Sequence, residues 1–183
     1  ADENQVAIGT VAATDADGDS VTYTASGSDI LIDGGSGAIT FEFAPDYEYK
    51  TSYSTTITAT DGFNSSSQDI TIAVNNLNDN YPELVSPAYF EVDENQTSIG
   101  TINATDADGD TLEYSISGTE SAGIRIDPSS GALSFIDPPD YETKTFYSFI
   151  GTVSDAPGRT SGFLVQIKLN NLNNIFLIYG DAR

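Results

Sequence analysis

The sequence predicts an all-β protein made of two tandem β-sandwiches. Three observations predict it: a long internal repeat, short runs in which every second residue is apolar, and turn-forming Gly, Asp, Asn and Ser between the runs. No long stretch has the period of an amphipathic helix. About seven short strands in roughly 90 residues is the strand content of an immunoglobulin-like Greek-key β-sandwich. We therefore expect two such sandwiches, arranged end to end.

The repeat defines the units. The stretch DENQVAIGTVAATDADGDSVTY begins at Asp2, and DENQTSIGTINATDADGDTLEY begins at Asp93, 91 residues later. An insertion near Ser121 precedes the match of GSGAITFEFAPDYEYKTSY to SSGALSFIDPPDYETKTFY. These matches predict one domain at 1–80, a second at 81–174, and a tail or extra edge strand at 175–183. The join NDNYP is too short to be a flexible Gly/Ser tether.

The strands expected in the first unit follow from the alternation of apolar residues. The residues on the side of each run that is expected to face inward are, in order, Val6, Ile8 and Val11; Val21, Tyr23 and Ala25; Ile39, Phe41 and Phe43; Tyr53, Thr55, Ile57 and Ala59; and Ile70, Ile72 and Val74. An apolar fraction of 38% and frequent strand-forming residues argue against disorder.

Composition excludes several functions. The 183 residues include 28 acids and 6 bases, for a net charge of −22, and no His, Cys, Met or Trp. Thiol nucleophiles, Ser-His-Asp triads and zinc fingers are therefore excluded. Such a charge disfavours nucleic acid and anionic membrane surfaces as partners, and no run approaches the roughly 20 apolar residues of a membrane span. Without an initiator Met, we expect a mature piece of a longer polypeptide.

The acids gather in recurring clusters that suit calcium. DEN opens each unit, DADGD follows the first strand, DYE lies mid-unit, and a lone Asp precedes the last hairpin. Calcium takes about 6–8 oxygen ligands from carboxylates and carbonyls. An EF-hand would need Gly at position six and Glu at position twelve of the loop. Ser20 and Ser26 stand there in the first unit, and Thr111 and Ser117 in the second. The ligands must therefore be completed from elsewhere in the fold.

The order DEN, DAD, DYE, lone Asp and NDNYP resembles the cadherin repeat, twice and over nearly the whole chain. The tight DADGD turn is most similar to bacterial cadherin-like domains. The resemblance implies calcium between consecutive domains. It implies ligands at the central joint from the first unit (Glu3, Asp46 and Glu48), the linker (Asn76, the Leu77 carbonyl, Asn78, Asp79 and Asn80) and the second unit (Asp106, Asp108 and Asp155). Asn76 stands where the family usually has Asp.

The charge at this joint predicts about three calcium ions. Seven of the implied ligands are carboxylates, and three Ca²⁺ leave one negative charge uncompensated where two would leave three. Calcium should therefore make the joint rigid, and like-charge repulsion should make it flexible without the metal. The outer ends would hold half-sites, formed by Asp15, Asp17 and Asp61 at one end and by Glu94, Asp140 and Glu142 at the other. Asn174 stands where the first unit has Asp79, which predicts weaker calcium binding there.

Two other functions compete with calcium. The DYE carboxylates resemble a glycosidase acid–base pair, but their repetition beside linker acids favours metal. A sugar platform would use Phe41, Phe43, Tyr47, Tyr49 and Tyr53, although core packing explains Phe41 and Tyr47 equally well.

We therefore predict a non-enzymatic, extracellular or cell-surface calcium-binding module for adhesion or structural extension. Its partner would be an identical chain, another surface protein or a polysaccharide. A third possibility is a passive spacer, which would differ from this module only in having no binding face. The alternative is a carbohydrate-binding module of a secreted polysaccharide-processing protein.

Overall fold

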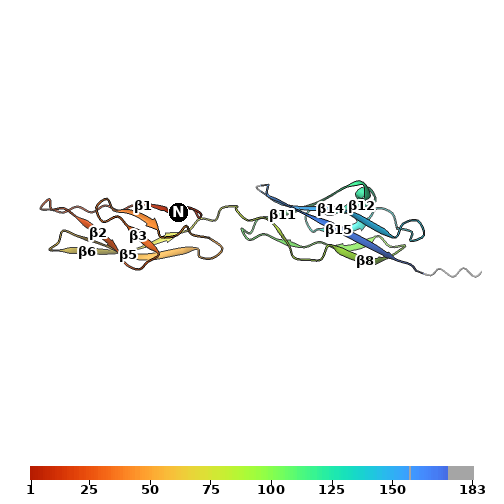
Figure 1. The fold of residues 1–183 in the computed structure, drawn as a ribbon, viewed down its shortest axis with the longest axis horizontal. Helices are drawn as coiled ribbons and strands as arrows, with labels where there is room; N and C mark the ends of the chain where they lie inside the picture. The colour runs from red at the N-terminus through yellow and green to blue at the C-terminus, as the bar shows by residue number, and fades with distance from the viewer. Residues whose placement is uncertain (157, 173–183) are drawn as a thin grey trace, which may run out of the picture. The chain divides into compact units, whose positions relative to one another are not determined.

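The structure is a computed structural model that describes residues 1–156 and 158–172 (Figure 1). The chain divides into two compact units, Ala1–Asn78 and Asp79–Arg183, called here the first and the second unit. Asn174 and the predicted tail at 175–183 lie outside the described residues.

The first unit consists of two three-stranded antiparallel sheets. One sheet has the order β1-β4-β3 and the other the order β2-β5-β6. The strands are β1 (Ala7–Thr10), β2 (Thr22–Ala25), β3 (Ile30–Ile32), β4 (Ala38–Phe41), β5 (Ser52–Thr60) and β6 (Ser65–Ala73). A parallel bridge between Asp2 and Asn75 joins the two ends of this unit.

The second unit repeats this plan with a larger sheet. Its sheets have the orders β12-β13-β9, β11-β14-β15-β8 and β10-β7, and β8 pairs with β15 in parallel. The elements are β7 (Glu83–Leu84), β8 (Tyr89–Asp93), β9 (Ser98–Thr101), β10 (Ala104–Thr105), β11 (Leu112–Ser117), the 3₁₀ turn η1 (Thr119–Gly123), β12 (Ile124–Ile126), β13 (Ala132–Phe135), β14 (Phe146–Asp155) and β15 (Thr160–Asn170). The turn η1 contains Ser121, near which the second repeat carries its insertion.

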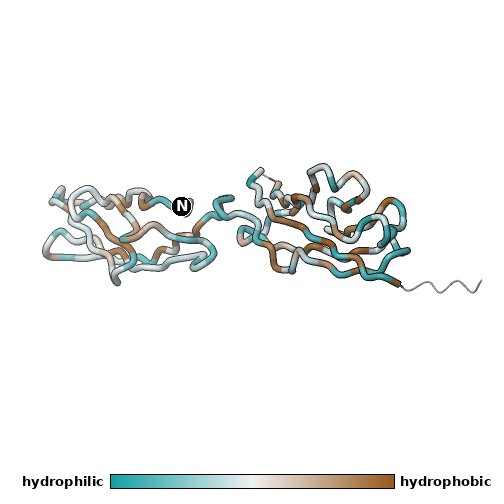
Figure 2. The backbone as a smooth tube through the Cα atoms, turned by 45° about the vertical axis from the view of Figure 1, so that its right-hand side comes forward, coloured by the Kyte–Doolittle hydropathy of each residue, from teal (hydrophilic) through white to brown (hydrophobic). Residues whose placement is uncertain are grey.

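Each unit has its own apolar core, and the apolar stretches in Figure 2 follow the strands. The first core contains Ile30, Ile39, Phe41, Ile72 and Val74. The second is larger and contains Val92, Ile99, Ile102, Tyr114, Ile124, Leu133, Phe135, Phe149, Val153, Val165, Ile167 and Leu169. Buried residues alternate with more exposed ones along the C-terminal halves of β14 and β15, as a half-buried sheet requires.

The all-β prediction is confirmed for the described residues, with two corrections in the first unit. The sequence interpretation missed β3, whose Ile30 is buried in the core. It also extended the alternation after Phe41 to Phe43, but β4 ends at Phe41 and Phe43 is 78% exposed. Phe43 is therefore a surface aromatic.

Candidate metal centre

The DADGD turn of the second unit gathers three carboxylates. Asp106 Oδ1 accepts the backbone N–H groups of Asp108 at 2.9 Å and of Asp110 at 3.5 Å. Gly109 has a positive φ of 81°, which lets the chain reverse within this turn. Asp106, Asp108 and Asp110 each offer a carboxylate oxygen within 4.8 Å of the others. The sequence therefore folds locally into a cluster of acids rather than spreading them along a strand.

Asp106 Oδ2 is the unusual atom of this cluster. It is buried and has no hydrogen-bond partner. A buried carboxylate oxygen without a donor is costly, and native proteins normally pair such an atom or bind a cation there. The burial of Asp106 Oδ2 without a hydrogen-bond donor is therefore consistent with a bound metal ion at this cluster.

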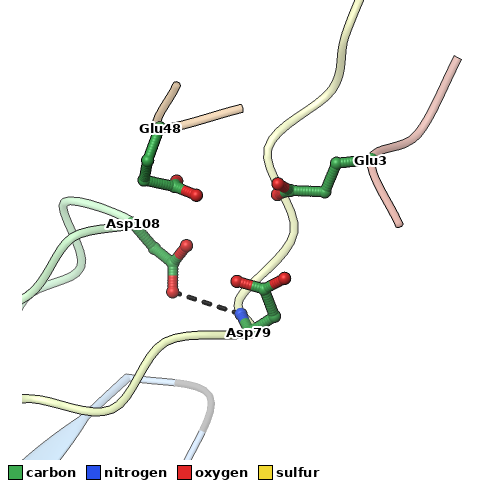
Figure 3. A group of neighbouring side chains, drawn as sticks. All are labelled: Glu3, Glu48, Asp79 and Asp108. Carbon is green, nitrogen blue, oxygen red and sulfur yellow. Dashed lines mark hydrogen bonds between the residues drawn. The ribbon is translucent and has the colours of Figure 1, made fainter. Parts of the chain in front are cut away.

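Asp108 connects the turn to the start of the second unit. Its Oδ2 accepts the N–H groups of Asp79 at 3.2 Å and of Asn80 at 2.9 Å, and the first of these bonds is drawn in Figure 3. The side-chain amide of Asn80 donates to Asp108 Oδ1 at 3.1 Å and to Asp79 Oδ1 at 2.9 Å. Asp79 and Asp108 also offer oxygens within 4.8 Å of each other. The N-terminal segment of the second unit is therefore fastened to its DADGD turn.

The first unit holds a different carboxylate pair. Glu3 is only 2% exposed, and its Oε2 and Oε1 accept the N–H groups of Tyr47 and Leu77, both at 2.7 Å. Glu48 is exposed and offers an oxygen within 4.8 Å of one from Glu3. Figure 3 shows these two carboxylates pointing toward one another. Glu3 is therefore held by backbone donors while it faces a second acid.

Asp155 lies at the end of β14, 5% exposed. Its Oδ1 accepts the N–H groups of Gly158 and Arg159, each at 2.7 Å. The Arg159 guanidinium lies 4.9 Å from the ring centre of Tyr81. Tyr81 lines a cavity of about 510 Å³ together with Asp79 and Asp106. Asp155 is thus a buried carboxylate already engaged by a turn.

The far end of the second unit repeats the Glu3 arrangement. Glu94 is 3% exposed and accepts the N–H groups of Tyr141 at 3.0 Å and of Leu172 at 2.8 Å. Its oxygens lie within 4.8 Å of oxygens from Asp140 and Glu142. Hydrogen bonds, first from the Thr143 hydroxyl and then from the Glu142 N–H, hold the pKa of Asp140 below its ordinary value. This predicted half-site is therefore assembled as a group of three acids.

The predicted half-site of the first unit is looser. Asp15 Oδ1 accepts the N–H groups of Asp17 at 2.9 Å and of Asp19 at 3.1 Å, as in the matching turn. Asp61 lies with Asp15 on one cavity of about 190 Å³. Backbone hydrogen bonds from Asn64 and Phe63 lower the pKa of Asp61. Asp15, Asp17 and Asp61 do not form a group of three mutually close oxygens.

The remaining predicted ligands lie nearer the surface. Asp46 is exposed, and its Oδ1 accepts the Tyr49 N–H at 3.1 Å. Asn76 is exposed and Asn78 is half-buried. Sequence reasoning left Asp110 out of the ligand set, although the cluster includes it. The signal was present, since Asp110 is the third acid of DADGD and Gly109 turns the chain before it.

Comparison with known proteins identifies relatives with shared sequence and fold. Residues 88–170 match the family model described as Cadherin domain. Protocadherin Fat 4 of Mus musculus is 32% identical over 78% of this chain, and Cadherin-99C of Drosophila melanogaster is 33% identical over 94% of it. The chain spans only 3% and 11% of the lengths of these two relatives.

Solved structures match the fold as well. Mouse Cadherin-23 EC22-24 matches with a TM-score of 0.79 at 26% identity, covering 95% of this chain and 63% of that one. Human Protocadherin-24 EC1-2 matches with a TM-score of 0.81 at 20% identity, covering 93% and 92%. These matches confirm the prediction of tandem immunoglobulin-like β-sandwiches. Within the described residues, no helix is long and apolar enough to cross a membrane.

Proposed function

The chain is a tandem of cadherin repeats, and from that premise we propose that it is an extracellular adhesion module whose linker binds calcium. The family match at residues 88–170 and the internal repeat support this role for both units. Calcium supplies a multivalent positive charge that many oxygen ligands share. The proposed role uses this charge to fix geometry and involves no catalysis.

The observation that carries the proposal is that both sets of acids are bonded to one short segment. The Leu77 N–H donates to Glu3, and the Asp79 N–H donates to Asp108. Two peptide units join Leu77 to Asp79, so their Cα atoms are at most about 7 Å apart. Covalent continuity alone therefore keeps Glu3 and Asp108 near the same three residues.

The donor set suits a hard divalent cation. We propose that the ligands are the carboxylates Glu3, Asp46, Glu48, Asp79, Asp106, Asp108 and Asp155, with oxygens of Asn76, Leu77, Asn78 and Asn80. Carboxylate and amide oxygens are the groups calcium prefers, whereas Zn²⁺ favours the imidazole and thiolate ligands that this chain lacks. Asp106 Oδ2, which accepts no hydrogen bond, would coordinate a cation, and about three ions would neutralise most of the charge.

The proposed consequence is mechanical. Without calcium, several carboxylates within a few ångströms of one another repel and favour an open linker. With calcium, shared ligands hold the linker in one geometry and present the surface of each unit in a fixed orientation. Such a module would serve adhesion to a second copy or to another surface protein, or extend a larger ectodomain. The comparisons give no support to the polysaccharide alternative.

Calorimetric titration with Ca²⁺, combined with small-angle X-ray scattering with and without EDTA, tests the proposal. We expect saturable binding, a rise in melting temperature, and a narrower distribution of molecular dimensions in calcium. Asp108→Ala should lower the affinity of the tightest site at least tenfold while both units stay folded in EDTA, because Asp108 both faces the cluster and holds the linker.

Asp17→Ala is the matched control. Asp17 has the position of Asp108 in the other DADGD turn, and its N–H donates to Asp15 just as the Asp108 N–H donates to Asp106. It should leave the tightest site unchanged. Equal affinities for the two variants, or dimensions that EDTA does not alter, would contradict the linker site.

A further inference from the structure

The first unit contains a cavity that the calcium proposal does not explain. It has a volume of about 570 Å³, and its lining includes Asp29, Glu42, Phe43, Asp46, Tyr49 and Lys50. Volumes of roughly 300–1,000 Å³ are typical of ligand pockets. Phe43 and Tyr49 are 78% and 86% exposed, so two aromatic rings stand largely in solvent at its rim. We call this the aromatic pocket.

Part of the aromatic pocket is structural, because the second unit has it too. Lys50 Nζ bonds Asp29 at 2.8 Å and lies 4.0 Å from the ring centre of Tyr53. Lys144 does the same with Glu120 at 2.7 Å and Tyr147 at 4.3 Å. An ammonium between an acid and a tyrosine therefore belongs to the repeat.

Matching backbone hydrogen bonds align the rest of the pocket. The Glu42 N–H donates to the Asp29 carbonyl, and the Ile136 N–H donates to the Gly123 carbonyl, which equates Glu42 with Ile136. The Lys50 N–H donates to Asp46, and the Lys144 N–H to Asp140, in the same way. The intervening positions then correspond one to one.

The rim differs between the repeats. Where the first unit has Glu42, Phe43 and Tyr49, the second has Ile136, Asp137 and Thr143. The fold of the repeat therefore does not need an acid or aromatic rings at these positions. Exposed aromatic surface forgoes burial that would stabilise the protein by about 25 cal/mol per Å². Two such rings around a cavity indicate a binding surface.

We propose that the aromatic pocket binds an arginine side chain of a basic partner protein. Three carboxylates line the pocket against one ammonium, and that ammonium is engaged by Asp29. With Asp46 assigned to calcium, Glu42 remains for a bidentate pair with a guanidinium, which also stacks on aromatic faces. The net charge of −22 attracts a basic protein.

Titration of the ¹⁵N-labelled chain with the peptide acetyl-Gly-Arg-Gly-Arg-Gly-amide tests the proposal. All samples contain saturating calcium. An absence of peptide binding would therefore not bear on the proposed calcium site, and an absence of calcium binding would be detected separately, in the calorimetric titration. We expect saturable shifts confined to the amides of residues 28–29 and 42–53, and none with the peptide carrying citrulline in place of arginine. Glu42→Gln and the double variant Phe43→Ser/Tyr49→Thr should each weaken binding about tenfold, because each removes one of the two modes of recognition.

The variants should fold, because Glu42 and both aromatic residues are exposed and the second repeat has polar residues at both aromatic positions. Their melting temperatures in calcium serve as the check. Equal response to the citrulline peptide, or no shift in the pocket, would overturn the proposal. So would shifts caused by xylohexaose or cellohexaose instead of the arginine peptide, or by self-association at rising protein concentration.

Discussion

Glu3 and Leu77 are joined by a hydrogen bond of 2.7 Å from the leucine N–H to a buried carboxylate oxygen. The other oxygen of Glu3 accepts the Tyr47 N–H at 2.7 Å. The second unit repeats the relationship between Glu94 and Leu172 at 2.8 Å. The residue that we propose as a calcium ligand therefore also fixes the end of its own sandwich through backbone donors.

Glu3→Gln separates these two roles. Glutamine places an NH₂ group against one of two backbone N–H donors, which leaves a buried donor without an acceptor. In EDTA, where no metal contributes, we expect the first unit to lose about 1–3 kcal/mol of unfolding free energy in urea denaturation. Glu42→Gln is the control in the same unit, and as an exposed substitution it should stay within about 0.5 kcal/mol. Equal stability of the two variants in EDTA would refute the backbone-fixing role.

Gly37 and Gly27 allow a clean test of close backbone approach. Both have positive φ angles, of 72° and 79°. A Cβ at Gly37 would lie 2.3 Å from the Val11 carbonyl oxygen, whereas one at Gly27 meets nothing within 4 Å. Gly27→Ala should cost about 1–2 kcal/mol from backbone strain alone. Gly37→Ala should cost clearly more, because the Val11 carbonyl, which directly follows β1, must move away from the turn. Thermal unfolding measures the stability lost in both variants. If Gly37→Ala loses no more stability than Gly27→Ala, the contact with the Val11 carbonyl is relieved at no energetic cost.

The fold class followed from the sequence because it depends on periodicity and repetition. Alternation along β5 and β6 and the match between the two DADGD stretches were sufficient for tandem sandwiches. β3 escapes prediction because its three residues, Ile30–Ile32, form a continuous apolar run that is too short to display a period of two. The prediction for Phe43 is wrong because an alternating pattern does not indicate where the backbone hydrogen bonds of a strand end, and β4 ends at Phe41.

The acidic clusters were predictable for a different reason, namely that short-range turns bring neighbouring acids together. The DADGD carboxylates converge through local hydrogen bonds to Asp106. The pairing of Glu3 with Glu48, which are 45 positions apart, came only from the family resemblance and depends on tertiary packing. The sequence pointed to Phe43 and Tyr49 as members of an aromatic surface but did not separate them from the buried Phe41, because exposure of a given Phe or Tyr is set by where the strands end.

Asp127 should titrate at a much lower pH than an ordinary aspartate. The Ser129 hydroxyl, together with the N–H and hydroxyl groups of Ser130, lowers the pKa of Asp127 from 3.8 to about 2. Since the folded pKa is depressed, the resulting stabilisation is complete above about pH 4 and is lost as the pH falls toward 2. Carbon-detected NMR of the carboxyl group measures this directly.

The first repeat supplies the matched variant. Asp33 occupies the same turn, where Gly35 replaces Ser129, and its pKa is lowered by Ser36. Ser129→Gly should therefore raise the pKa of Asp127 while leaving the turn intact. A titration midpoint near 3.8 in the native chain, or one that Ser129→Gly does not move, would show that the serine hydroxyl is not the cause.

Asp110 should contribute to calcium binding although its position lies outside the family motif. Its carboxylate lies within 4.8 Å of those of Asp106 and Asp108, so removing its charge lowers the attraction for a cation at that cluster. We expect Asp110→Asn to weaken Ca²⁺ binding several-fold in calorimetry, less than Asp108→Ala, because Asp108 also accepts the backbone N–H groups of Asp79 and Asn80. Asp19→Asn, at the matching position of the first unit, should leave the tightest site unchanged. If both asparagine variants bind calcium as the native chain does, Asp110 only completes the turn, and the cluster binds metal through Asp106 and Asp108 alone.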